Sequence, residues 1–304
     1  AVAMGWLFAL HFRIGVLNNW LVQLFGLSET PFDIATVVGM GWVEGLNLTP
    51  LTFVMTAAVL RAMDPTLEEA AYTNGANTRR TILQVTLPLV WPGILSAMLY
   101  TFVIGFSAFD VPAIIGWSNR IYTFSTQLYL HINPSEDLPR YGMAAAQSAV
   151  MIPVAILISL WYRQVQRNAE RYRVITGKNY RPRLVKLRGK VFLAWGFLGL
   201  YLVLGQLIPI LALVWSSLLQ FFQQPSLATM KFLSLANFRV LPWDTIAEGA
   251  ENTIILVLAT PTITVIISLA FSWVVLRSKY RWRGMYDFFA FLPHAIPNII
   301  FGIG

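Results

Sequence analysis

The sequence predicts an all-α, polytopic membrane protein with about six to seven membrane-crossing helices. The 304-residue chain is 57% hydrophobic and only 12% charged, whereas soluble proteins carry about 25% charged residues. The charges gather in short clusters between long apolar runs, and each run has roughly the 20 residues that a helix needs to cross a bilayer. Because polar and apolar residues do not alternate within these runs, a membrane β-barrel is excluded.

The apolar runs define six complete candidate spans and the end of an earlier one. In chain order the six are Val37–Leu60, Leu87–Phe109, Gly142–Tyr162, Val191–Leu219, Thr253–Leu276 and Tyr286–Gly304. Residues Ala1–Leu10 have the composition of the last part of a preceding span. The chain starts without Met and stops within an apolar run, so we expect it to be a window from a longer protein.

Lys and Arg indicate which loops face the cytoplasm, because short cytoplasmic loops of membrane proteins are enriched in them. If the spans alternate, the basic loops Asp64–Thr86, Arg163–Lys190 and Arg277–Arg283 share one side. The opposite loops have fewer basic and more acidic residues; they are His11–Thr36, Asp110–Tyr141 and Gln220–Ala250. The first three loops are therefore predicted to be cytoplasmic.

The loop Arg163–Lys190 holds ten basic residues and one acidic residue, Glu170. Such a cluster acts as a topology anchor between two halves of the chain, or it binds anionic lipid headgroups. Nucleic acid is not an expected partner, because the cluster lies against a bilayer and lacks the interleaved aromatic residues on which bases stack.

The most informative segment is the polar one after the first complete span. Pro65 is suited to the first turn of a helix, and Gly75 can adopt a positive φ and end that helix. A second short helix is expected from Asn77 or Thr78, both possible caps, to Thr86. The result would be a helix–turn–helix along the membrane face. Taken residue by residue, the same segment could equally be an ordinary interfacial hairpin.

The complete pattern of this segment resembles the EAA loop in permease subunits of binding-protein-dependent ATP-binding cassette importers. The matching residues are Glu69, Ala70, Ala71, Gly75, Val85, Leu87 and Pro88. Val85 replaces the more usual Ile. The resemblance implies that residues 64–88, here called the coupling loop, form a coupling helix seated in a cleft of a cytoplasmic ATPase. Glu69 would then make a polar contact, Ala70 and Ala71 would allow close approach, and Gly75 would set the turn.

Weaker matches to the same family extend over most of the chain, including Phe109–Pro112, Glu251–Thr253 and Leu292–Pro297. They imply a MetI-like permease helical bundle, in a fused form that resembles ferric-iron permeases. Residues 1–163 would be the C-terminal part of a first permease domain, 164–190 a basic cytoplasmic linker, and 191–304 the N-terminal part of a second domain.

The resemblance implies a multi-pass permease of the bacterial inner membrane that imports a small solute by alternating access. Ferric iron is the best guess for the solute. The implied partners are a cytoplasmic ATPase dimer, a periplasmic solute-binding protein and the lipid bilayer, with no nucleic acid. The chain has no Gly-x-x-x-x-Gly-Lys-[Ser/Thr] phosphate loop, so ATP and magnesium are expected on the partner ATPase. No catalytic residue, cofactor or protein-bound metal is expected on this chain.

Two acidic residues lie where they could line the pathway. Glu44 falls within an apolar span, where ionisable residues usually face a bundle interior or a cavity. Asp110, at the outer end of the next span, could line the outer mouth. The alternatives are a hydrated Glu44 at the interface and an Asp110 that caps the short segment containing Pro112.

Two other functional classes remain as alternatives. An ion-coupled secondary transporter would need several ionisable residues at mid-membrane depth, and only Glu44 qualifies here. A membrane-embedded enzyme would need a cluster of catalytic side chains, which the sequence does not show.

Overall fold

The computed structural model describes residues 1–134, 138–171, 188–226, 228–277 and 285–286. Every regular element in these residues is helical, which confirms the predicted all-α class. The described residues form two compact units. One combines Ala1–Ile34 with the described part of Ile208–Pro293, and the other is the described part of Ala35–Leu207.

Five helices among the described residues are long and apolar enough to cross a membrane. They are Val37–Arg61, Thr78–Asn119, Tyr141–Tyr162, Val191–Ser217 and Trp243–Arg277. These helices correspond to the first five predicted spans. The predicted sixth span, Tyr286–Gly304, lies outside the described residues apart from Tyr286. Most of the basic cluster in Arg163–Lys190 also lies outside the described residues.

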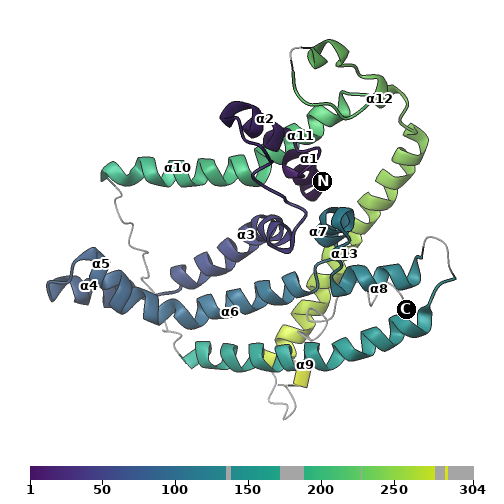
Figure 1. Ribbon diagram of the computed structural model, residues 1–304. Helices are drawn as coiled ribbons and strands as arrows, with labels where there is room; N and C mark the ends of the chain where they lie inside the picture. The colour runs from purple at the N-terminus through teal and green to yellow at the C-terminus, as the bar shows by residue number, and fades with distance from the viewer. Residues whose placement is uncertain (135–137, 172–187, 227, 278–284, 287–304) are drawn as a thin grey trace. The chain divides into compact units, whose positions relative to one another are not determined.

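The second unit is built on three long helices, α3 (Val37–Arg61), α6 (Leu87–Phe106) and α9 (Tyr141–Arg171). Helix α6 packs between α3 and α9 (Figure 1). The hydroxyl groups of Thr52 on α3 and Thr101 on α6 lie 3.1 Å apart and share a hydrogen bond. Hydrogen bonds between small polar residues hold helices together where lipid gives no hydrophobic driving force.

Helices α3 and α6 are in close contact at Gly93. A Cβ atom on this glycine would lie 2.5 Å and 2.7 Å from the two Cγ atoms of Val59. Because Val59 is stiff at χ1, it cannot swing aside. The glycine therefore allows the two antiparallel helices to pack closely. This packing links the coupling loop, at one end of the hairpin, to the far ends of α3 and α6.

We expect Gly93→Ala to destabilise the folded protein by about 1–3 kcal/mol, the usual penalty for overpacking. Thermal unfolding of the full-length protein in detergent would measure the loss. Gly105→Ala is the matched control, because Gly105 lies in the same helix with nothing within 4 Å of its would-be Cβ. Val59→Ala should restore the stability of Gly93→Ala. Equal shifts for Gly93→Ala and Gly105→Ala would contradict the contact.

The second unit contains further, shorter elements. They are α4 (Pro65–Thr73), α5 (Thr78–Thr81), the π-helix η1 (Ile82–Thr86), α7 (Asp110–Ile115), the 3₁₀-helix η2 (Gly116–Asn119), α8 (Phe124–Ile132), the 3₁₀-helix η3 (Arg188–Lys190), α10 (Val191–Leu202) and the π-helix η4 (Val203–Leu207). Figure 1 shows α3 bending along its length, as expected of a helix that contains an internal proline, Pro50.

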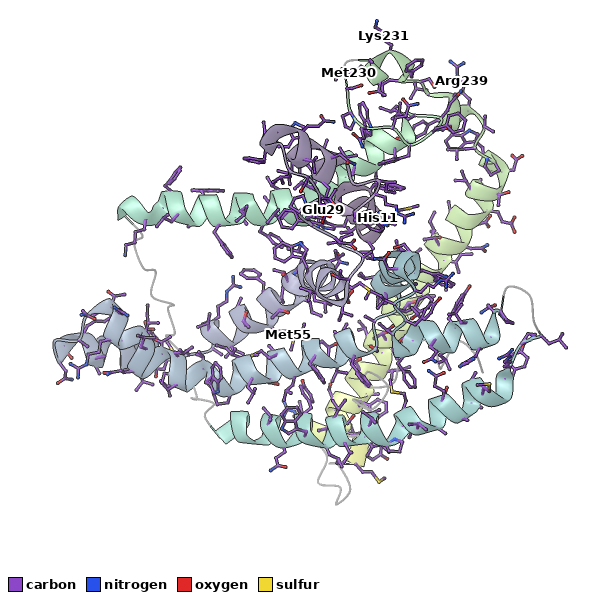
Figure 2. All side chains as sticks on the ribbon, viewed as in Figure 1. His11, Glu29, Met55, Met230, Lys231 and Arg239 are labelled. Carbon is purple, nitrogen blue, oxygen red and sulfur yellow. The ribbon has the colours of Figure 1, made fainter. Side chains whose placement is uncertain are left out.

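The first unit contains α1 (Val2–Leu10), α2 (Val16–Phe25), α11 (Ile208–Ser217), the 3₁₀-helix η5 (Thr229–Phe232), α12 (Ala236–Arg239) and α13 (Trp243–Arg277). Helix α1 packs against α11, and Gly5 allows this because a Cβ there would lie 2.4 Å from the carbonyl oxygen of Pro209. Between α11 and α13, Lys231 and Arg239 point outward (Figure 2).

The predicted outer loops contain helices that the sequence reading did not anticipate. Helix α2 lies within His11–Thr36, and α7 and α8 lie within Asp110–Tyr141. Helix α13 begins at Trp243, ten residues before the predicted span. The difference has a physical reason: hydropathy reports which residues suit lipid, whereas a helix can continue through polar sequence beyond the bilayer. Local capping also starts short helices, as at Thr123 before α8.

Candidate functional site

The coupling loop begins with helix α4, which starts as the sequence predicts. Pro65 occupies its first turn, and the Asp64 carboxylate accepts a hydrogen bond from the backbone N–H of Thr66 at 2.9 Å. Glu68 follows in the first turn, where a negative charge suits the helix dipole. Proline and two acids therefore fix the start of α4 by local chemistry alone.

The same helix ends in a Schellman motif at Gly75, whose φ of +79° confirms the predicted positive value. The N–H of Ala76 donates to the carbonyl of Ala71, and the N–H of Gly75 donates to that of Tyr72, both at 3.0 Å. These two bonds satisfy carbonyl groups that the end of a helix leaves without partners. Glycine sets the reversal because other residues rarely adopt this conformation.

Asn77 is the cap of the second helix, since its side-chain oxygen accepts from the N–H of Arg80 at 2.9 Å. The sequence reading placed a separate helix here, ending at Thr86. Instead, α5 continues through η1 into α6 as one helix from residue 78. Figure 1 shows α4 and α5 together at one end of the α3–α6 hairpin.

The helix widens where Pro88 interrupts its hydrogen bonding. Pro88 has no N–H to donate, and just before it the N–H of Leu87 bonds five residues back, to the carbonyl of Ile82. This π-type turn carries the helix past the proline. The π-helix η4 stands in the same relation to Pro209, and single π-turns inside helices are frequent at functional sites.

The residues that match the motif are mostly accessible. Glu69, Ala70, Gly75, Leu87 and Pro88 are exposed, while Ala71 and Val85 are half-buried. The side chain of Glu69 forms no hydrogen bond or ion pair with the residues that the structure describes. Its neighbour Glu68 instead accepts a hydrogen bond from the hydroxyl of Thr86 at 2.6 Å. Two adjacent carboxylates thus differ: one is held within the loop, and the other is presented outward.

The Glu68–Thr86 bond is the part of the site that sequence reasoning missed. The two residues are 18 positions apart, and no pairwise pattern connects them. The only available signal was the expected helix–turn–helix, in which the start of the first helix lies beside the end of the second.

The two proposed pathway residues come together at the end of the α3–α6 hairpin opposite the coupling loop. Glu44 is half-buried on α3, and Asp110 is exposed at the first position of α7. Helices α3 and α7 pack against each other, which places both acids at this end of the hairpin. Asp110 does not act as a cap, contrary to the structural alternative, because Phe109 holds the cap position and α7 starts at Asp110 itself.

Among the described residues, no group of three or more His, Cys, Asp or Glu side chains could hold a metal ion.

Comparison with known proteins identifies the family. The sequence profile described as "Binding-protein-dependent transport system inner membrane component" matches residues 5–171, which is more than half of the chain. A protein of Haemophilus influenzae provisionally named a ferric transport system permease, FbpB 1, is 23% identical over 96% of this chain and 45% of its own length. The ferric transport system permease FbpB of Actinobacillus pleuropneumoniae is also 23% identical, over 96% of this chain and 41% of its own.

A spermidine/putrescine permease, PotB of Haemophilus influenzae, is 26% identical over 49% of this chain and 51% of its own length. No solved structure matches the chain. The chain spans less than half the length of the two ferric relatives. The family match, the all-helical spans and the coupling loop agree, and the protein belongs to the inner membrane permeases of binding-protein-dependent ATP-binding cassette transport systems.

Proposed function

We propose that this chain is part of a permease that imports a cationic solute, with ferric iron as the leading candidate, using ATP hydrolysed by a separate cytoplasmic ATPase. A periplasmic binding protein would deliver the solute. The observation that carries the proposal is the coupling loop: a capped helix and a glycine turn that present Glu69 and Ala70 at the end of the α3–α6 hairpin.

The mechanism follows from how this hairpin is built. Ala70 leaves a partner free to approach α4 closely, while the exposed Glu69 offers a carboxylate for a cation on that partner. Movement of α4 reaches the membrane through α3 and α6, which are joined by the Val59–Gly93 contact and the Thr52–Thr101 hydrogen bond. The same two helices position Glu44 and Asp110 at their far end. Closure of the ATPase would thereby reorient Glu44 and Asp110, so that the solute pathway beside them opens to the other side of the membrane.

Crosslinking tests the coupling part of the proposal. The chain contains no cysteine, so in the full-length protein, freed of any cysteines elsewhere, Ala70→Cys can be linked to single cysteines on the ATPase. We expect a crosslink whose yield changes with ATP. Ser226→Cys, in the segment between α11 and α13, is the control and should give none. Absence of the Ala70 crosslink in the assembled complex would reduce the loop to an interfacial hairpin.

The identity of the solute is supported by the relatives and by charge. Two relatives are named as ferric transporters and one as a polyamine transporter, and both kinds of solute are cations that a pair of carboxylates could attract. Uptake of ⁵⁵Fe(III) and of labelled spermidine into proteoliposomes, each with its binding protein, separates the two. Iron uptake that requires ATP supports the proposal; spermidine uptake alone would replace iron. Uptake that persists without ATP but collapses with the ion gradient would favour a secondary transporter.

A further inference from the structure

The coupling loop is closed by a side-chain bond that the family motif does not include. Glu68 lies one position before the motif glutamate, and Thr86 lies between Val85 and Leu87. Glu68 Oε1 accepts from Thr86 Oγ1 at 2.6 Å. Both residues are half-buried, and α4 packs against η1 around them. The bond joins the first turn of α4 to the last residue of the π-helix.

Apart from this bond, α4 is joined to the second helix by the chain reversal at residues 74–77 and by packing against α5 and η1. A force applied at the exposed face of α4 acts to rotate that helix about the turn. The Glu68–Thr86 bond holds the opposite end of α4, so the two attachments together fix its orientation. A hydrogen bond to a charged acceptor is also stronger than one between neutral groups.

Thr86 is also placed where movement would enter the membrane. It ends η1 immediately before Leu87 and Pro88, where the helix already departs from regular α geometry. Beyond this point α6 continues as an α-helix, with Pro92 inside it, to its contact with α3 at Gly93. A pull on Glu68 is therefore delivered to the start of α6.

We propose that Glu68 and Thr86 are positioning residues that clamp α4 to α6. The clamp couples solute transport to ATP hydrolysis. This inference rests on the proposed ATP-driven import. Both side chains are half-buried and bond to each other, so the proposed clamp acts within the permease. Its loss should leave binding and hydrolysis of ATP in place while fewer solute molecules cross per ATP.

The experiment uses the full-length permease with its ATPase and binding protein in proteoliposomes, and measures solute uptake and phosphate release together. Glu68→Ala and Thr86→Val each remove the bond. We expect both to lower the uptake-to-hydrolysis ratio by about tenfold, the effect of losing one hydrogen bond to a charged group. The double variant should be no worse than either single variant, because the two residues act through one interaction.

Conservative variants separate positioning from folding. Glu68→Gln keeps an acceptor oxygen and Thr86→Ser keeps the hydroxyl donor, so both should retain most of the ratio. Thr262→Val is the matched control, because it removes a hydroxyl bond to the carbonyl of Leu258 that lies within α13, outside the coupling loop. Its ratio should equal that of the wild type.

Three results would overturn the clamp. One is an unchanged ratio in Glu68→Ala and Thr86→Val. Another is a proportional loss of uptake and hydrolysis, which indicates damage to the assembly. The third is additive effects in the double variant. Failure of the proposed function is recognised separately, because then the wild-type protein itself shows no ATP-dependent uptake and no Ala70 crosslink.

Discussion

Replacing Asn18 with alanine is expected to destabilise the first unit by about 2–4 kcal/mol. Asn18 is completely buried. Its side-chain amide donates to the carbonyls of Leu10, His11 and Phe32, and its oxygen accepts from the N–H of Phe32. Removing this side chain takes a partner from both the N–H and the carbonyl of Phe32, whereas the carbonyls of Leu10 and His11 keep the N–H groups of Ile34 and Gly15. Each backbone group that loses its partner costs roughly 1 kcal/mol or more.

The loss would be local, because Asn18 ties the chain after α1 to the segment that follows α2. Hydrogen exchange at the backbone N–H of Phe32 in the full-length protein reads the opening of that contact directly. Asn19→Ala is the matched control: its amide reaches only the carbonyl of Gly15, one helical turn back. Exchange at Phe32 should accelerate strongly for Asn18→Ala and little for Asn19→Ala. Equal rates in the two variants would show that Asn18 does not hold this segment.

The coupling loop could be predicted from sequence because its boundaries depend on neighbouring residues. Pro65 and the acids after it specify a helix start, and Gly75 specifies its end. Asn77 then caps the next helix. Each of these helix boundaries is determined by residues within one helical turn of it, so a single sequence is enough to predict it. Placing the motif on a helix–turn therefore required no knowledge of the packing around it.

The contacts that complete the site could not be predicted in the same way. The Glu68–Thr86 bond and the approach of Val59 to Gly93 depend on how separate helices meet. Within uniformly apolar helices, hydrophobic periodicity gives almost no indication of which face packs inward. The continuation of α5 into α6 was missed for a related reason: Pro88 suggested a break, and the π-turn before it absorbs the missing hydrogen bond.

Glu44 and Asp110 show what a single sequence can and cannot predict. Glu44 and Asp110 could each be selected from sequence, because ionisable residues within or beside membrane spans are seldom incidental. Their proximity is a product of the antiparallel hairpin, in which the start of α3 meets the end of α6. A single sequence suggested two separate candidates, and the packing of α3 against α7 brings them to the same end of the hairpin.

Glu69→Lys is expected to reduce ATP-driven uptake by about thirtyfold or more. Glu69 is exposed and forms no interaction with the described residues, so the substitution leaves α4 intact. At the proposed ATPase contact, the new ammonium group would face the cation that the carboxylate is expected to bind. Losing one partner of a desolvated charge pair costs about 2–5 kcal/mol, and about 1.4 kcal/mol corresponds to a tenfold change. The ATPase should also copurify less with the variant.

Glu29→Lys provides the control for this charge reversal. Glu29 is also exposed, but it lies after α2 in a loop predicted to face the other side of the membrane. We expect this variant to retain the ATPase on purification. Glu69→Gln should fall between Glu69→Lys and the wild type, because an amide keeps an acceptor oxygen but not the charge. If Glu69→Lys instead transports and copurifies like the wild type, Glu69 does not contact the ATPase. The coupling surface of α4 would then have to be sought on its other exposed residues, which are Thr66, Leu67, Ala70 and Thr73.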